Sequence, residues 1–220
     1  MQILYEDNHL LVAVKPPGLA TMGLGDGEET FLTLAKDYIR QKYHKPGCVY
    51  LGVVSRLDVP VSGVVVFART SKAAARLNEQ FRDRTVTKTY LALVEGTIEP
   101  ATAVCIDRIR EDERHRKVWI TRDSIGKESK LSYRRLDQLA ACSLIEVRLE
   151  TGRKHQIRVQ LASRGFPILG DRKYGARSVF PDGIALHAWR LALQHPIGGK
   201  TLEFVAPVPA GWKKFGVGVQ

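Results

Sequence analysis

An apolar run, Val64-Val65-Val66-Phe67-Ala68, limits the possible folds of this chain more than any other feature. β-branched runs bounded by proline and glycine are typical of strands, and Val53-Val54 gives a second such segment upstream. The chain must turn between the two, at Pro60 and at Ser62-Gly63, and the connecting segment carries one carboxylate, Asp58. Asp58 is therefore expected where two strands are joined.

Two interpretations of Asp58 follow from its neighbours. Aspartate bonds its own backbone well, so Asp58 fits a surface turn. However, Arg56 lies two residues before it, and Leu57 and Val59 flank it with apolar side chains. A carboxylate in such surroundings belongs either to a structural ion pair or to a poised reactive group. The local sequence leaves both interpretations open.

The charge balance indicates a polyanionic partner. The 220 residues include 34 Lys and Arg against 23 Asp and Glu, a formal net charge of +11. Cations that neutralise phosphates release condensed counterions, so this balance favours RNA or DNA. The alternative is a basic surface without such a partner. The length allows one domain or two closely joined lobes.

Cysteine usage and hydropathy predict a soluble cytoplasmic protein without membrane association. The three cysteines are an odd count with no C-x-x-C pair, so neither a disulfide framework nor zinc-finger spacing is available. Reduced thiols are the simplest account of them. The longest apolar runs have only five or six residues, far short of the roughly 20 needed to span a bilayer.

Periodicity and turn residues predict an α+β fold with a mainly antiparallel sheet and flanking helices. Helices are expected after the capping residues Thr30 and Thr70-Ser71. Strands are expected as a hairpin within Met1–Ala20, a strand over Thr87–Val94, a pair formed by Lys130–Asp137 and Cys142–Glu150, and a hairpin formed by Ile184–Leu193 and Lys200–Phe204.

Two segments remain open. The glycine-rich Thr21–Glu29 lacks the spacing of a phosphate-binding motif and is predicted to be a flexible loop. Val104–Ile120 is either a solvated loop or a segment that contacts RNA, because it mixes cations with an aromatic side chain. Its relevant residues are Arg108, Arg110, Arg114, His115, Arg116, Lys117 and Trp119.

A second polar cluster spans Thr151–Leu161. A short helix is expected here, with Ile157 and Leu161 directed inward and Arg158 beside them. A desolvated arginine requires pairing, so Arg158 is expected to have a carboxylate partner. The preceding cations, imidazole and amide suit contacts with a nucleic acid. The alternative is a solvated helix start with one structural ion pair.

Three separated segments resemble the motifs of RluA-type pseudouridine synthases: Arg56-Leu57-Asp58 with Ser62-Gly63, Lys88–Gly96 and Thr151–Arg158. Three shorter ones are similar to the same family: Gly170-Asp171 with Tyr174-Gly175, Leu186-His187-Ala188, and Glu6-Asp7 with Val14-Lys15-Pro16-Pro17-Gly18. Their order and spacing agree with the family from about residue 3 to residue 207.

The resemblance implies a pseudouridine synthase catalytic fold, with a mixed, mainly antiparallel central sheet and a central active-site cleft. It implies a single catalytic domain over residues 1–220, with its core at about 3–207 and no N-terminal RNA-binding domain before it. The implied function is that of an isomerase that converts a specific uridine of ribosomal or transfer RNA to pseudouridine. Neither a metal nor another cofactor is expected, and the expected state is a monomer.

The resemblance also implies roles for individual residues. Asp58 would be the nucleophile, attacking either the ribose C1′ or C6 of the base. Arg158 would pair with Asp58, Tyr90 would stack on the target base, and Leu186 would pack against it. Arg56 would enter the RNA helix where that base has left the stack. Further RNA contacts are predicted for Lys88, Arg153, His155 and Gln156.

The sequence departs from the family pattern at Ser55, Val61 and Gln160, which replace the usual His, Thr and His. None of these changes removes Asp58, Tyr90 or Arg158. The alternative is an RNA-binding protein of the same fold without turnover. An aspartate-based hydrolase fits poorly, because no second carboxylate stands at a fixed spacing from Asp58.

Overall fold

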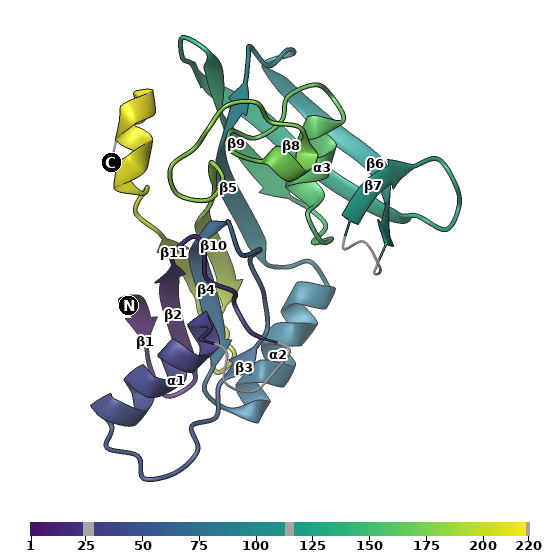
Figure 1. The fold of residues 1–220 in the computed structure, drawn as a ribbon. Helices are drawn as coiled ribbons and strands as arrows, with labels where there is room; N and C mark the ends of the chain where they lie inside the picture. Colours follow the sequence, from purple (N-terminus) through teal and green to yellow (C-terminus); the bar gives the residue numbers. More distant parts are fainter. Residues whose placement is uncertain (24–28, 113–116, 219–220) are drawn as a thin grey trace. The chain divides into compact units, whose positions relative to one another are not determined.

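A computed structural model describes residues 1–23, 29–112 and 117–218 (Figure 1). Most of the predicted glycine-rich loop, residues 24–28, and Arg114, His115 and Arg116 lie outside the described residues. The chain divides into two compact units. Unit 1 comprises Met1–Thr87 with Ala188–Pro207, and unit 2 comprises Lys88–His187 with Val208–Gln220. The single catalytic domain over residues 1–220 stays a prediction.

Unit 1 is built on an antiparallel sheet. Its strands pair in the order β1-β2-β4-β10, with β11 paired to β10 and β3 paired to β4. The predicted hairpin at the start of the chain and the hairpin of β10 with β11 are both confirmed. The bounds are β1 Gln2–Glu6, β2 Leu10–Lys15, β3 Gly52–Val53, β4 Ser62–Ala68, β10 Leu186–Gln194 and β11 Thr201–Val205.

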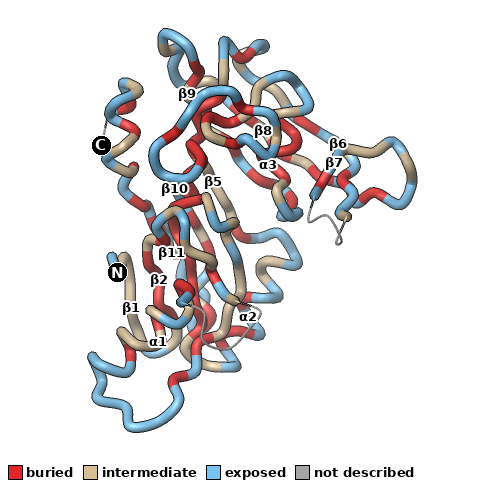
Figure 2. Tube along the Cα trace, viewed as in Figure 1, coloured by how far each residue is buried: buried red, intermediate tan, exposed pale blue. Residues whose placement is uncertain are grey.

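Apolar residues line both faces of the unit 1 sheet. On β4, Val65 and Phe67 pack against the side chains of α1 (Phe31–Lys42), while Val64 and Val66 pack against those of α2 (Ser71–Arg82). Every residue of β4 is buried, which explains the uninterrupted apolar run from Val64 to Ala68. Figure 2 shows the buried residues concentrated along the strands and the exposed ones mostly in the connections.

Both helices of unit 1 begin at the predicted capping residues. The hydroxyls of Thr30 and Thr70 each accept a hydrogen bond from the backbone N–H three residues later, at Thr33 and Ala73. Thr33 also completes a capping box, because its hydroxyl accepts a hydrogen bond from the Thr30 N–H. These bonds satisfy N–H groups that have no partner within the helix.

The strands of unit 2 pair in the order β5-β9-β8-β6-β7, and each of these pairs is antiparallel. The predicted pairing of the segments around Lys130–Asp137 and Cys142–Glu150 is confirmed by β8 and β9. The bounds are β5 Thr87–Glu95, β6 Thr102–Asp112, β7 Lys117–Thr121, β8 Lys127–Gln138, β9 Cys142–Leu149, α3 Gln156–Ala162, and the 3-10 helices η1 Arg172–Tyr174 and η2 Ala210–Phe215.

The charged segment Val104–Ile120 is not a loop where the structure describes it. It forms β6 and β7, in which Arg110 pairs with Trp119 and their side chains are in cation–π contact. The solvated-loop interpretation is therefore wrong for the described part of this segment. Cys105, Ile109 and Val118 are buried in these strands, and Ile109 and Val118 pack with Val159 of α3.

The α+β class with a mainly antiparallel sheet is confirmed. Each residue-level strand pairing given above is antiparallel, and three α-helices accompany the strands in the part of the chain that the structure covers. Within that part, no helix is both long enough and apolar enough to cross a membrane.

Candidate active site

The segment that carries Asp58 is held on both sides by the loop that follows β2. The N–H of Leu57 donates to the Thr21 hydroxyl at 3.1 Å, and this hydroxyl donates to the Leu57 carbonyl at 2.9 Å. The carbonyl of Val59 accepts a hydrogen bond from the N–H of Gly18 at 2.9 Å. Since both neighbours of Asp58 are fixed, its backbone has little freedom to move.

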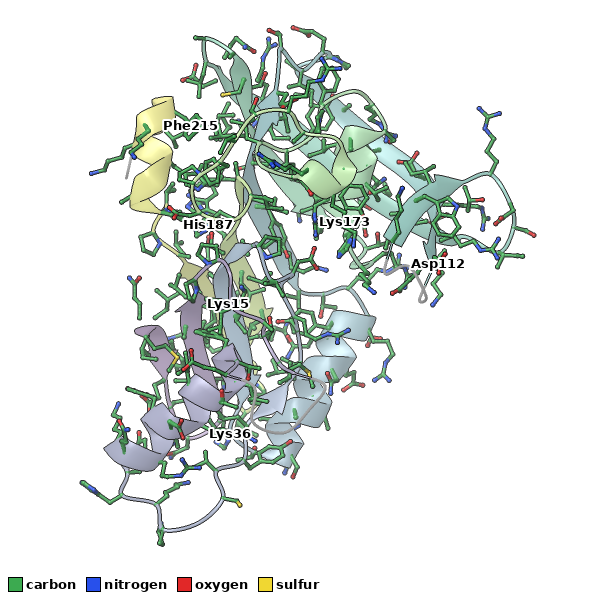
Figure 3. All side chains as sticks on the ribbon, viewed as in Figure 1. Lys15, Lys36, Asp112, Lys173, His187 and Phe215 are labelled. Atoms are coloured by element: carbon green, nitrogen blue, oxygen red, sulfur yellow. The ribbon has the colours of Figure 1, made fainter. Side chains whose placement is uncertain are left out.

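Lys15 supplies a further contact to this segment. It is fully buried, and Figure 3 shows it among the strands of unit 1. Its Nζ donates to the carbonyl oxygens of Pro16, Leu19 and Val59 at 2.8, 2.6 and 3.2 Å. Burial lowers the pKa of Lys15 to about 8, and the nearby negative charge of Asp58 acts in the opposite direction.

The turn after Asp58 requires glycine at position 63. The N–H of Val61 donates to the Asp58 carbonyl at 3.0 Å, and Gly63 follows with φ of 124°. A Cβ on Gly63 would lie 2.2 Å from the carbonyl oxygen of Ala188, so no larger residue fits without a backbone shift. Val61, one of the departures from the family pattern, has a buried side chain.

In unit 2, Tyr90 lies on the sheet face that α3 covers. Tyr90 of β5 pairs with Val147 of β9, which pairs with Tyr133 of β8, so these three side chains share one face. On the same face, Gln160 of α3 donates to the carbonyls of Cys105 and Ser129. The predicted RNA contact Lys88 also belongs to this face of β5, and its Nζ lies 3.3 Å from the position that a Cβ on Gly152 would take.

Arg158 of α3 is buried and has the carboxylate partner that the sequence predicts for it. Its Nε donates to Oδ2 of Asp171 at 2.7 Å, and its Nη2 donates to Oδ1 at 2.9 Å. The fractional exposures of Arg158 and Asp171 are 5% and 1%. Asp171 was not predicted to be this partner, although it lies in the Gly170-Asp171 motif. The pairing of Arg158 with Asp58 stays a prediction.

Tyr174 lies against the same guanidinium. Its ring centroid is 5.0 Å from Cζ of Arg158, and its hydroxyl is 2.7 Å from Nδ1 of His155. His155 precedes α3 with a left-handed backbone, φ 53°. Arg158, Asp171, Tyr174 and His155 therefore form one connected polar cluster in unit 2.

The other predicted site residues differ in exposure. Arg56 and Arg153 are exposed, and Nε of Arg153 donates to the Glu128 carbonyl at 3.3 Å. Leu186 is buried at the start of β10.

Gln156 is 2% exposed, and its amide is used within the protein. The amide oxygen accepts hydrogen bonds from the Thr151 hydroxyl and the Arg153 N–H, and Nε2 donates to the Lys130 carbonyl. This geometry gives Gln156 a structural role in shaping the turn before α3.

The functional residues that the sequence did not predict are those that act through long-range contacts. Thr21, Lys15 and Asp171 touch the predicted catalytic residues or their neighbours from segments that no local pattern connects to them. Within the described residues, no group of three or more His, Cys, Asp or Glu side chains is arranged to hold a metal ion.

Comparison with known proteins gives a consistent family. Residues 9–163 match the family model for RNA pseudouridylate synthases. The chain is 37% identical over 219 residues to ribosomal large subunit pseudouridine synthase D of Nitrosomonas europaea, covering 95% of this chain and 62% of that protein. It is 36% identical to the Zymomonas mobilis protein of the same name, covering 95% and 69%.

Solved structures agree with the sequence matches. Human RNA pseudouridylate synthase domain containing 4 superposes with a TM-score of 0.80 at 25% identity, over 97% of this chain and 92% of that one. Human RNA pseudouridylate synthase domain containing 1 gives 0.76 at 28% identity, over 94% and 83%. The resemblance read from the motifs is thus confirmed, and this chain belongs to the RNA pseudouridylate synthase family.

Proposed function

We propose that this protein is an RNA pseudouridine synthase that uses Asp58 as its nucleophile. The match over residues 9–163 carries the proposal, because this span contains Asp58, Tyr90 and Arg158. The hydrogen bonds that hold Leu57 and Val59 support the role of Asp58. A nucleophile fixed before the substrate arrives loses little entropy on the way to the transition state.

The chemistry requires only the enzyme and the RNA. Isomerisation breaks the bond between N1 of uracil and C1′ of ribose, and forms a bond between C5 and C1′. One proton leaves C5 and one is gained at N1, so no oxidant, reductant or group donor enters the balance. The Asp58 carboxylate attacks C1′ or C6, forms a covalent adduct and is released after the uracil has rotated.

Three other residues complete the proposed site. Arg158 pairs with Asp58 and stabilises the negative charge of its carboxylate. Tyr90 stacks on the target base, and Leu186 packs against it. The two hydrogen bonds that Arg158 donates to Asp171 support this assignment, since they give the guanidinium a defined orientation.

The remaining predicted residues are proposed to contact the RNA. The reacting carbons of a stacked uridine are out of reach, so the base must leave the helix, and Arg56 is proposed to take its place. Lys88, Arg153 and His155 are proposed to contact the RNA around it. Gln156 is left out of this set, because its amide already bonds within the protein.

Large-subunit ribosomal RNA is the proposed substrate, with transfer RNA as the alternative. Relatives with 36–37% identity are named for the ribosomal large subunit, although the chain spans only 62–69% of their length. We further propose a cytoplasmic location, which the three free cysteines support. The monomeric state stays a prediction that light scattering can check.

Mapping pseudouridines in ribosomal and transfer RNA from cells with and without the gene tests this proposal. We expect one or a few uridines to lose the modification when the gene is deleted and to regain it when a plasmid supplies the wild-type gene. Identical maps in all three strains would contradict the proposed function. The class of RNA that changes decides between the two substrates.

A further inference from the structure

Asp171 occupies one side of the Arg158 guanidinium completely. Both of its carboxylate oxygens accept hydrogen bonds, one from Nε and one from Nη2. The two side chains are only 6% and 1% exposed, so water competes little with these bonds. A planar guanidinium bound through two parallel hydrogen bonds has one orientation, unlike an ammonium group.

The turn after Gly170 is shaped to bring two side chains onto Arg158. Gly170 has φ of 82°, and a Cβ there would lie 2.7 Å from Cβ of Phe180. The N–H groups of Tyr174 and Ala176 both donate to the Asp171 carbonyl, at 3.0 and 3.2 Å. This tight turn places Asp171 and Tyr174 three residues apart, one on the edge and the other against the guanidinium of Arg158.

Tyr174 is itself anchored. Its hydroxyl lies 2.7 Å from Nδ1 of His155, and the two rings meet edge to face at 87°. The Tyr174 ring also packs against the buried cluster that contains Val159 of α3. Arg158 is thus fixed by a carboxylate along one edge and by an anchored aromatic ring.

We propose that Asp171 is a positioning residue of the reaction, one that acts through Arg158. This inference rests on the proposed function, in which Arg158 serves Asp58. Asp171 holds the Nε and Nη2 side, so the orientation of the Nη1 side is set before RNA binds. Its charge also balances the guanidinium, which would otherwise be costly to bury. Tyr174 limits rotation of the guanidinium out of this orientation.

The Asp171→Asn variant separates positioning from a purely structural role. The reaction is followed in single turnover, with enzyme in excess over an unmodified transcript of large-subunit ribosomal RNA that carries tritium at C5 of uridine. Misplacement of a catalytic group by a fraction of an ångström to 1 Å costs up to about 100-fold in rate. We expect a loss of about this size in the rate constant. The final amount of product and the Kd for RNA should each stay within about threefold.

The matched control is Asp107→Asn. Asp107 pairs with Arg164 after the other end of α3 and also bonds Gln160, so the substitution removes a carboxylate–arginine pair in the same unit. Its rate constant should equal that of the wild type. If Asp171→Asn lowers the amount of product but leaves the rate constant unchanged, the role of Asp171 is structural and the proposal fails.

A double-mutant cycle with Arg158→Lys tests whether Asp171 acts through Arg158. Lysine cannot reproduce the two parallel bonds, so adding Asp171→Asn to Arg158→Lys should slow the reaction less than about threefold further. Two losses that multiply would show independent action and overturn the proposal.

Tyr174→Leu keeps the inference testable if Asp171→Asn does not fold. It removes the ring against the guanidinium and leaves the carboxylate pair, so the rate constant at saturating enzyme should fall. An unchanged rate constant would count against the positioning role. A wild-type protein that forms no pseudouridine in any RNA would instead refute the proposed function, and this inference with it.

Discussion

At the scale of single residues, Lys15 helps to fix the segment of unit 1 that carries Asp58. Lys15 directs its amine at three carbonyl oxygens, and one of them belongs to Val59, the neighbour of Asp58. The Lys15-Pro16-Pro17-Gly18 segment resembles a family motif, but the motif does not explain why a lysine is needed at position 15. The reason is the long-range contact, which no pattern along the chain reveals.

Lys15 makes the stability of unit 1 depend on pH. Its pKa is about 8 in the folded protein and 10.5 in an unfolded chain. Between these values the unfolded state binds more protons than the folded state, so the free energy of unfolding rises with pH. We expect the difference between wild type and Lys15→Met to shift in favour of the wild type by on the order of 2–3 kcal/mol from pH 7.5 to 10.5.

Urea unfolding at several pH values measures this difference. The substitution Lys72→Met, at an exposed position on α2, controls for loss of a surface lysine. Wild-type and Lys15→Met stabilities that run parallel across the whole range would contradict the account of Lys15.

At the scale of elements, the sequence predicted most helices and strands but not the contacts that tie them together. Thr30 and Thr70 were identified as caps because capping depends on neighbouring residues. β6 and β7 escaped prediction because the exposed positions Val104, Ile106 and Trp119 are apolar and Asp107 puts a charge on the buried face, so apolar and polar residues do not alternate. The attachment of α3 to the η1 turn through Asp171 joins residues 13 apart, and a pattern of hydrophobicity contains no information about it.

Removing the guanidinium from α3 should destabilise unit 2 strongly. Arg158→Met leaves the buried carboxylate of Asp171 without its partner, and breaking a buried pair in this way costs about 3–5 kcal/mol. Arg164→Met is the control, because the Arg164–Asp107 pair is partly exposed, and a loss nearer 1 kcal/mol is expected there. Urea denaturation at pH 7 compares the two variants. Equal losses in the free energy of unfolding would show that burial does not make the Arg158–Asp171 pair more costly to break than the partly exposed pair.

At the scale of the whole molecule, the residues of the proposed site are divided between the two units. Asp58 and Arg56 belong to unit 1, while Tyr90, Arg158 and Leu186 belong to unit 2. The family resemblance predicted this set from motifs far apart in the sequence, and local periodicity could not have done so. The net charge of +11 suits a polyanionic substrate, although it does not distinguish a catalyst from a binding protein.

Asp58→Asn tests the central claim most directly. The variant and the wild type are each incubated, in excess over the RNA, with the tritium-labelled ribosomal RNA transcript. Tritium release and the Kd for RNA are both measured. Asp83→Asn, at the exposed end of α2, serves as the control. We predict no detectable release by Asp58→Asn, a Kd within about threefold of the wild type, and normal release by Asp83→Asn. Pseudouridine formation by Asp58→Asn at a rate near that of the wild type would contradict the assignment of Asp58 as the nucleophile.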